Sequence, residues 1–580
     1  MVNLTIDGKQ IQAEENTTIL QAALDNGIDI PTLCFLKDIN EVGDCRMCVV
    51  EVEGMRNLAT SCVQKVSEGM VVKTHSPAVT QSRRLTLDLI LSNHHRDCLT
   101  CSRNGNCELQ DLAAKFNITQ VQYEGTKTYH KVDDKSPSIV RDFNKCILCR
   151  RCVATCKKVQ NIGAIDCTQR GFDSCVSTTY DNSLNDVDCT LCGQCIEACP
   201  TGALKEKDAT EAVWRAINDE EKIVIAQTAP AVRVALGEEF GMPIGTNVAG
   251  KMVTSLKAIG FDKVFDTNTG ADLTIMEEAN EFLERVQNGG TLPMITSCSP
   301  GWVRFAEKNF PDCLDHLSSC KSPHQMFGAI IKSYYAEKYG IDKEKIVTVS
   351  VMPCTAKKYE CSRPEMEVGG LRDVDYVLTT REAARMIKQA NVDLSKMDDT
   401  PFDDPMGEAS GAGAIFGTTG GVMEAALRTA ADTLEGKDIQ EIEYHDIRGE
   451  KGIKEATLEI AGKTINICVA SGLSNARKIL EEIREGKSKY HFVEIMACPG
   501  GCIMGGGQPI KSAKIRLTTN VAKLRRDAIY SIDEKSTIRK SHQNPVMKTL
   551  YDEFLEKPGS HVAHKYLHTH YNKQDLYEID

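Results

Sequence analysis

CILCRRCVATC (146–156) and CTLCGQCIEACP (189–200) are the two stretches that decide how the first part of this chain folds. Each run has the spacing C-x2-C-x2-C-x3-C, and a proline follows the second run. Cysteines separated by two residues cannot easily bridge each other, but their thiolates chelate a metal well. The repeated run therefore predicts a small domain built around bound metal.

The duplication is typical of bacterial two-cluster ferredoxins, in which the fourth cysteine of each run binds the other cluster, and it makes zinc improbable. One predicted [4Fe–4S] cluster has the ligands Cys146, Cys149, Cys152 and Cys199. The second has the ligands Cys189, Cys192, Cys195 and Cys156. Between the runs lie Cys167 and Cys175, which we expect to be buried thiols without a redox role.

A first cysteine group precedes these runs and consists of Cys34, Cys45, Cys48 and Cys62. Around it, VNLTIDGKQIQA and VVEVEG alternate like strands, and TTILQAALDNGIDI has helical spacing after a threonine cap. A β-grasp-like module with four thiolates would hold a [2Fe–2S] cluster. Zinc is the less favoured alternative.

A second group combines one histidine with three cysteines: His94, Cys98, Cys101 and Cys107. By local chemistry this set fits zinc and a [4Fe–4S] cluster equally well, and His95 could replace His94. Four clusters in succession would form an electron wire. The rest of the chain should then contain a redox active site that uses these electrons.

Composition limits the possible functions. The chain has 580 residues, 25 cysteines and a formal charge of −12. Its acidic balance argues against nucleic-acid binding, and no apolar run reaches membrane-spanning length. The N-terminus lacks the regions of a secretory signal. We therefore expect a cytoplasmic protein whose cysteines bind metal rather than form disulfides.

The second half has the pattern of an α/β domain. Short apolar strands are predicted at 222–228, 263–266, 294–297 and 347–352, and another in HFVEIMA (491–497). Sites in such domains lie at the carboxyl ends of strands. Four cysteines follow strand ends: Cys298, Cys354, Cys498 and Cys502. Taken singly, each of these cysteines could be a buried thiol, and the CPGGC pair could be a redox disulfide. Taken together, they favour a metal site.

Three loops resemble the signature loops of [FeFe]-hydrogenases: TSCSPGW (296–302), VMPCTAKK (351–358) and EIMACPGGCIMGGGQP (494–509). Over essentially its whole length the chain resembles the large clostridial-type members with four accessory clusters. This resemblance favours a [4Fe–4S] cluster at the His/Cys3 group. It also implies an H-cluster, which is a [4Fe–4S] cubane bridged to a two-iron unit with CO, cyanide and azadithiolate. Reversible H2 oxidation and proton reduction would occur there.

The resemblance also implies roles for individual residues. The cubane ligands would be Cys354, Cys498 and Cys502, with Cys502 at the bridging position, and Lys357 would bind cyanide. The apolar lining would comprise Pro230, Met352, Phe416 and Met496. The proton path would comprise Glu278, Glu281, Ser318 and Arg285. The segment TIMEEANEFLER places Glu278, Glu281 and Arg285 on one face of a predicted helix. That face could instead be a charged surface exposed to solvent.

Three positions depart from the family pattern. In the family this loop usually has two consecutive cysteines, of which the first relays protons and the second binds the cubane. Here Cys298 occupies the first position and Ser299 the second. Because a serine alkoxide is a poor ligand for a soft metal, we favour a shifted loop with Cys298 as fourth ligand and Ser299 as proton relay. Ala231 replaces a common serine and His324 a common glutamine. The remaining cysteines are assigned to packing: Cys313, Cys320, Cys361 and Cys468.

The prediction is a multidomain α/β and α+β protein. Its parts are a [2Fe–2S] β-grasp domain (1–80), a His/Cys3 domain (81–125), a two-cluster ferredoxin domain (126–209), an α/β catalytic H-cluster domain (210–515) and a small-subunit-like segment (516–580). Implied partners are ferredoxin, NAD(P)H- or flavin-binding subunits, and maturation proteins. The chain itself shows no dinucleotide-binding GxGxxG after a strand. The alternatives are an electron-transfer subunit of a larger redox complex and an H2 sensor.

Overall fold

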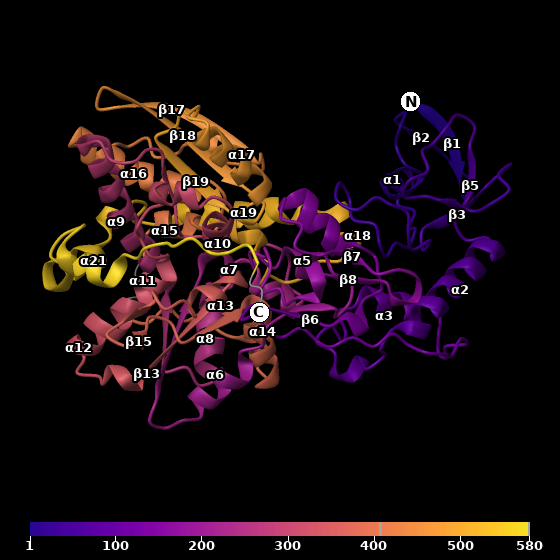
Figure 1. Cartoon of the computed structure of the whole chain (residues 1–580), viewed down its shortest axis with the longest axis horizontal. Helices are drawn as coiled ribbons and strands as arrows, with labels where there is room; N and C mark the ends of the chain where they lie inside the picture. Colours follow the sequence, from indigo (N-terminus) through magenta and orange to yellow (C-terminus); the bar gives the residue numbers. More distant parts are fainter. Residues whose placement is uncertain (405–408, 578–580) are drawn as a thin grey trace.

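The cysteine-rich N-terminal part lies at one end of the molecule and a larger α/β part at the other (Figure 1). The computed structural model describes residues 1–404 and 409–577. In Figure 1 the chain begins in the indigo sheet at one end, and its yellow last segment returns along the α/β part. None of the described helices is both long and apolar enough to cross a lipid bilayer.

The first domain is a five-stranded sheet in the order β2-β1-β5-β3-β4. Its strands are β1 (Val2–Ile6), β2 (Lys9–Ala13), β3 (Val49–Val52), β4 (Ala59–Thr60) and β5 (Val71–Lys73). The first two strands pair as an antiparallel hairpin, and its turn residues Asp7 and Gly8 both have positive φ. Helix α1 (Ile19–Asp25) begins as predicted, because the Thr18 side chain accepts the Gln21 N–H.

Two small cysteine-rich units follow. The first contains α2 (Pro77–Asn93) and α3 (Glu108–Lys115), and α2 continues across the predicted boundary at residue 80. The second contains β6 (Ile139–Arg141), α4 (Arg151–Ala154), β7 (Asp166–Thr168), β8 (Cys175–Ser177), α5 (Gln194–Ala198) and β9 (Leu204–Glu206). Cys175 is buried as expected, but the prediction for Cys167 was wrong: it is exposed, because it lies on a short two-stranded hairpin at the surface.

The α/β part contains two four-stranded sheets. The first is fully parallel in the order β11-β10-β13-β16. It consists of β10 (Ile223–Thr228), β11 (Lys263–Asp266), β13 (Ile346–Met352) and β16 (Tyr376–Thr379). The second has the order β12-β19-β18-β17, with only β17 antiparallel. It consists of β12 (Met294–Ile295), β17 (Ile453–Ile460), β18 (Lys463–Ser471) and β19 (Phe492–Met496). The strands predicted from the apolar runs are confirmed, although β12 ends before Thr296.

Helices pack around both sheets (Figure 1). They are α6 (Thr210–Ile217), α7 (Pro230–Arg233), α8 (Ala249–Ala258), α9 (Thr267–Asn288), α10 (Pro300–Asn309), α11 (Pro323–Ile330), α12 (Ala336–Lys338), α13 (Ala356–Glu360), α14 (Thr380–Gln389), α15 (Gly411–Ile415), α16 (Gly421–Glu435) and α17 (Leu473–Arg484). A hairpin of β14 (Glu367–Val368) and β15 (Leu371–Arg372) follows α13. The long α9 runs through the interior, because fourteen of its residues are buried.

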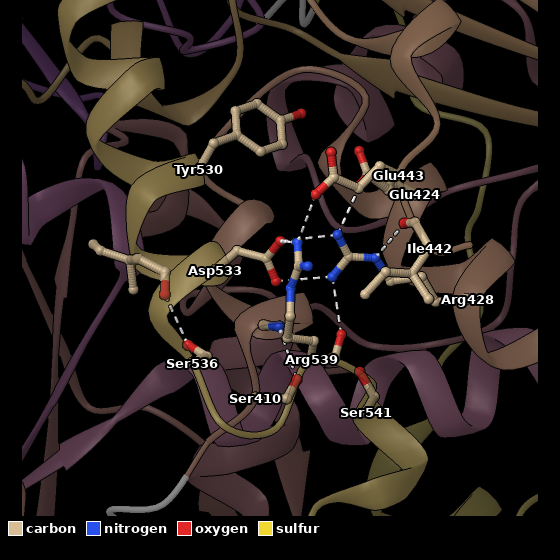
Figure 2. A network of polar contacts seen from close by, with 12 residues as sticks. Ser410, Glu424, Arg428, Ile442, Glu443, Tyr530, Asp533, Ser536, Arg539 and Ser541 are labelled. Atoms are coloured by element: carbon tan, nitrogen blue, oxygen red, sulfur yellow. Dashed lines mark hydrogen bonds and ion pairs between the residues drawn. The ribbon is translucent and has the colours of Figure 1, made fainter. Parts of the chain in front are cut away.

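The C-terminal segment wraps the α/β part with α18 (Ala513–Thr518), α19 (Val521–Lys535), α20 (Pro545–Leu550) and α21 (His561–Leu567). Figure 2 shows the polar network that anchors it. Arg428 on α16 binds Glu424 at 2.7 Å and Asp533 on α19 at 2.8 Å, and all three side chains are fully buried. Arg539 also binds Asp533, at 2.6 Å. Removing one partner of a buried ion pair strongly destabilises a protein, so this network fixes the segment in place.

Candidate active site

The two sheets of the α/β part deliver their strand ends to one cavity. Loops after β10, β12, β13 and β19 all reach it, as expected for carboxyl ends of parallel strands. The cavity is lined by every predicted ligand and lining residue of this part of the chain: Pro230, Ala231, Cys298, Ser299, His324, Met352, Cys354, Lys357, Phe416, Met496, Cys498 and Cys502. Sulfur donors, one ammonium group and apolar side chains therefore meet in a single enclosed space.

Glycines in the CPGGCIMGGG loop allow this convergence. Gly501 has φ +90°, and a Cβ there would lie 2.5 Å from the Thr419 nitrogen. A Cβ at Gly505 would lie 2.2 Å from the Pro353 carbonyl oxygen. Only glycine permits such backbone-to-backbone contact. The loop consequently brings Cys498 and Cys502 against the loop that carries Cys354.

Lys357 belongs to a buried polar triad at the cavity wall. Its Nζ donates to the Cys298 carbonyl at 3.1 Å and lies 2.8 Å from Oε2 of Glu360. His324 Nε2 lies 2.5 Å from the same oxygen, and its Nδ1 is 3.0 Å from Ser350 Oγ. Burial lowers the pKa of His324 to about 4, so its ring is neutral at pH 7. Burial opposes ionisation of Glu360, but Lys357 and His324 outweigh it and hold its pKa at about 2.

Glu360 was missed by the sequence analysis. The available signal was its position three residues after Lys357, which places both side chains on one face of α13. Its acceptor role could not be read from that spacing alone, because His324 comes from α11.

Cys298 and Ser299 lie at the start of α10 and point to different neighbours. Ser299 Oγ accepts the backbone N–H of Ala497 at 3.2 Å, directly before Cys498. Cys298 is buried, and burial followed by the nearby Glu278 carboxyl raises the pKa of its thiol well above the ordinary range. Both residues line the cavity, and the charge of Glu278 acts on the Cys298 thiol.

Glu278 begins a line of polar groups that leads away from the cavity. It is fully buried, and neither carboxyl oxygen has a hydrogen-bond partner in the described structure. Burial, then the charge of Glu281, raises its pKa to about 8. Ser318 Oγ donates to Glu281 at 2.9 Å, and Arg285 binds the same carboxylate at 2.6 Å. The predicted set therefore lies together and is largely buried rather than being a solvated helix face.

Two smaller cavities divide the eight ferredoxin-type cysteines crosswise. One is lined by Cys146, Cys149, Cys152 and Cys199. The other is lined by Cys156, Cys189, Cys192 and Cys195. Positive φ values at Leu148, Arg150, Leu191 and Gly193 curl each loop around its cavity. Each cavity therefore gathers three cysteines of one run and the last cysteine of the other.

The second of these cavities adjoins the central one, because Cys192 lines both. A Cβ at Gly193 would lie 3.1 Å from the Gly506 Cα, and Thr355 Oγ1 donates to the Leu191 carbonyl at 2.8 Å. Cys192 and Thr355 were not assigned to the central site from the sequence. Their place depends on how two domains dock, which local spacing does not encode.

The two N-terminal cysteine groups are also assembled. Cys48 Sγ and Cys62 Sγ lie 3.2 Å apart, and the Cys45 N–H lies 3.5 Å from Cys34 Sγ. In the next group, His94 lines a pocket with Cys98 and Cys107. A Cβ at Gly202 would lie 2.6 Å from Cys101 Sγ, so this glycine leaves room beside the thiol.

His94 and His95 differ in their partners. His94 is buried, its Nδ1 has no hydrogen-bond partner in the described structure, and burial lowers its pKa to about 4. The ring of His95 instead lies 3.3 Å from the Thr128 carbonyl. An unpartnered buried nitrogen beside cysteines is what a metal ligand offers.

Five family models match successive parts of the chain. Residues 1–77 match a 2Fe-2S iron-sulfur cluster binding domain, and 83–122 match the NADH-ubiquinone oxidoreductase-G iron-sulfur binding region. Residues 136–205 match the ferredoxin-like domain of NADH-quinone oxidoreductase subunit 3. Residues 222–506 match the C-terminal domain of the iron only hydrogenase large subunit, and 519–574 match the iron hydrogenase small subunit.

Similar proteins cover the whole chain. The NADP-reducing hydrogenase subunit HndD of Solidesulfovibrio fructosivorans is 50% identical, with 99% of each chain covered. Iron hydrogenase 1 of Clostridium pasteurianum is 45% identical, with 99% of this chain and 100% of that protein covered. A solved [FeFe]-hydrogenase from Chlamydomonas reinhardtii superposes with a TM-score of 0.57 at 40% identity and covers 63% of this chain and 99% of that one.

Proposed function

Because this chain belongs to the family of iron-only hydrogenases, we propose a specific assignment of its residues to the chemistry of H2. The chain is an [FeFe]-hydrogenase, an enzyme that interconverts H2 with protons and electrons at an H-cluster. The observation that carries the assignment is the single cavity in which Cys354, Cys498, Cys502 and Lys357 meet.

The donor set of this cavity fits the H-cluster. Thiolates of Cys354, Cys498 and Cys502 would hold the cubane, with Cys502 at the bridge to the two-iron unit. Lys357, fixed by Glu360, would donate to a cyanide ligand. The apolar lining of Pro230, Ala231, Met352, Phe416 and Met496, with His324 beside it, excludes water. When bound, the two-iron unit supplies the site at which H2 is split or formed.

For the departing loop we propose Cys298 as the proton relay and Ser299 at the fourth cubane position, rather than the shifted loop that the sequence favoured. Two observations support this arrangement. The charge of Glu278, the next proton carrier, acts on the Cys298 thiol, and Ser299 Oγ is held by the N–H next to Cys498. The cubane would then have three thiolates and a weaker oxygen donor.

Protons would leave Cys298 through Glu278, Ser318, Glu281 and Arg285. A carboxyl group with a pKa of about 8 can both give and take a proton near neutral pH, which suits Glu278 to a relay. Glu281 is oriented by Ser318 and Arg285 on the outer side.

Electrons would travel along one [2Fe–2S] and three accessory [4Fe–4S] clusters. The proposed ligands are Cys34, Cys45, Cys48 and Cys62 for the first, and His94, Cys98, Cys101 and Cys107 for the second. The two ferredoxin-type cavities follow, and the second adjoins the central cavity through Cys192. The domains proposed for these clusters are those predicted from the sequence, with the first boundary moved before α2.

The proposed electron partners are ferredoxin and a subunit that binds NAD(P)H or flavin. Similarity to an NADP-reducing hydrogenase subunit supports this proposal. Maturation proteins would supply the two-iron unit. A sensor with an H-cluster but little turnover remains the second candidate, and steady-state H2 turnover separates the two.

The deciding experiment is an infrared spectrum of anaerobically purified protein, produced in a host with hydrogenase maturation proteins. Sharp bands from metal-bound CO and cyanide that shift under H2 would support the assignment. Their absence, with accessory clusters intact by EPR, would refute it. Anaerobic co-purification with candidate nucleotide-binding subunits, followed by H2-dependent NADP⁺ reduction, tests the partner.

A further inference from the structure

The C-terminal segment places a histidine against the acidic face of α9. His568, just after α21, has Nδ1 2.8 Å from Ser319 Oγ and Nε2 3.0 Å from Oε2 of Glu277. Ser319 Oγ lies 3.2 Å from Oε2 of Glu281, the carboxylate that Ser318 and Arg285 also bind. A second chain of polar contacts therefore leaves Glu281, in addition to the one past Arg285.

We propose that His568 is a proton-transfer residue that gives Glu281 a second branch to the solvent. The proposal rests on the proton route through Glu281 described above. It adds Ser319, His568 and Glu277, none of which belongs to that route.

The chemistry of the branch is a proton relay. A serine hydroxyl and an imidazole can each donate and accept a hydrogen bond, so both can pass a proton. During H2 oxidation, Ser319 would give its proton to His568 Nδ1 and take one from Glu281. The imidazolium, which is bound through Nδ1 to Ser319 and through Nε2 to Glu277, would then release its Nε2 proton to water, and a flip of the ring would present the deprotonated nitrogen to Ser319 for the next proton. The reverse order serves proton reduction.

Glu277 holds His568 in position. Its side chain is fully buried and accepts hydrogen bonds from the Tyr551 hydroxyl and from the Gly559 N–H at 2.9 Å. Both donors belong to the C-terminal segment. With these donors on one side and His568 on the other, Glu277 fixes the orientation of the imidazole ring.

The surroundings of His568 also provide an exit. Its side chain is 6% exposed, and the exposed His564 lies beside it with ring centroids 4.1 Å apart. The titratable groups that face His568 are Glu277 and Glu281 from α9, Cys320 from the loop before α11, and His564 from α21. Water at the His564 edge would receive the proton.

The test combines variants of the two branches in the matured full-length enzyme. His568→Gln keeps a polar side chain but cannot carry a proton. Because the Arg285 branch remains in this variant, we expect its kcat for H2 evolution to fall about two- to fivefold. In the double variant, His568→Gln with Arg285→Gln, kcat should fall about 10²-fold, which is the effect of losing an acid–base group. Ser319→Ala with His568→Gln should lose no more than either alone, because both interrupt the same branch.

Three controls separate proton transfer from structural damage. His570→Gln changes an exposed neighbouring histidine and should leave kcat unchanged. Imidazole in the buffer should restore His568→Ala but not His568→Gln. A chelator during purification removes any metal bound by Glu281, Cys320 and His568, whose ligand atoms lie within 4.8 Å of one another.

The outcomes are distinct. His568→Gln with the same kcat as His570→Gln, or no enhanced loss in combination with Arg285→Gln, would overturn the branch. Missing CO and cyanide bands in the unaltered protein would instead refute the H-cluster assignment. Intact bands in His568→Gln, together with a reduced kcat and imidazole rescue of His568→Ala, would establish the relay.

Discussion

At the scale of single residues, the loop after β12 separates two tasks that adjacent side chains perform. Cys298 is buried within range of the charge of Glu278, whose carboxyl oxygens have no hydrogen-bond partner in the described structure, and Ser299 accepts the N–H of Ala497. A thiol exchanges protons readily, whereas a serine oxygen binds iron weakly. In the proposed arrangement, the sulfur of this loop would transfer protons and the cubane would have an oxygen neighbour.

This division predicts opposite effects for two substitutions. Cys298→Ala should lower turnover by about 10²–10⁴-fold, because Glu278 loses its proton partner, while the cubane EPR signal persists. Ser299→Cys should retain turnover and make the cubane more resistant to chelators. Cluster loss in Cys298→Ala, with full activity of Ser299→Ala, would indicate instead that Cys298 is the ligand.

His324 should make stability depend on pH. The pKa of His324 is about 4 in the folded chain, compared with an ordinary value of 6.5. Between pH 6.5 and pH 4 the unfolded chain therefore binds a proton at His324 that the folded chain does not bind. Stability is therefore lost as the pH falls from 6.5 towards 4, by about 2 kcal/mol at pH 5. The melting temperature of the unaltered protein should fall more between pH 7 and pH 5 than that of His324→Gln. Equal falls would contradict this role of His324.

At the scale of elements, α9 is the axis to which the C-terminal segment attaches. Asp272 accepts hydrogen bonds from Ser541 at 2.7 Å and Asn544 at 2.9 Å. Further along α9, Glu277 accepts one from Tyr551. These bonds satisfy buried carboxylates that a bare helix would leave unpaired. The segment thus completes the acidic helix that carries the proton route.

The network of Figure 2 predicts how firmly the segment is held. Asp533→Asn removes the buried partner of Arg428 and Arg539 and should destabilise the protein by about 3–5 kcal/mol. Limited proteolysis should then release the segment after α19. Asp527→Asn, which removes the charge that pairs half-exposed Asp527 with Lys523 and Arg526, should cost less than about 1 kcal/mol. Equal protease resistance of the two variants would show that the network is not the anchor.

At the scale of the whole molecule, the cysteine-rich end and the α/β end meet (Figure 1), and the proposed electron route crosses between them there. The contact is made by backbone, because a Cβ at Gly506 would lie 2.3 Å from the Cys192 carbonyl oxygen. Gln194 reinforces it by donating to the Met504 carbonyl at 3.0 Å. In the proposed assignment, these two glycine-containing loops would set the distance between the last accessory cluster and the cubane.

Gly506→Ala should therefore separate electron supply from catalysis. The added methyl group pushes the two loops apart, so viologen-linked H2 evolution should fall, while H2/D2 exchange, which needs no external electrons, should persist. Gly125→Ala is the matched control, because no atom lies within 4 Å of the Cβ it adds. Parallel loss of both activities in Gly506→Ala would mean that the change damages the catalytic loop itself.

The sequence by itself determined the cluster-binding groups, the strand ends that carry cysteines and the family. Metal ligands in short loops are set by local spacing, and apolar runs specify buried strands, so both can be read without a structure. Only the tertiary structure decided that Ser299 meets the N–H before Cys498, that Glu360 joins Lys357 to His324, and that His568 reaches Ser319 from 249 residues away. These contacts arise when separately formed elements pack and their buried polar groups must find partners, and no local pattern records which partner each will find.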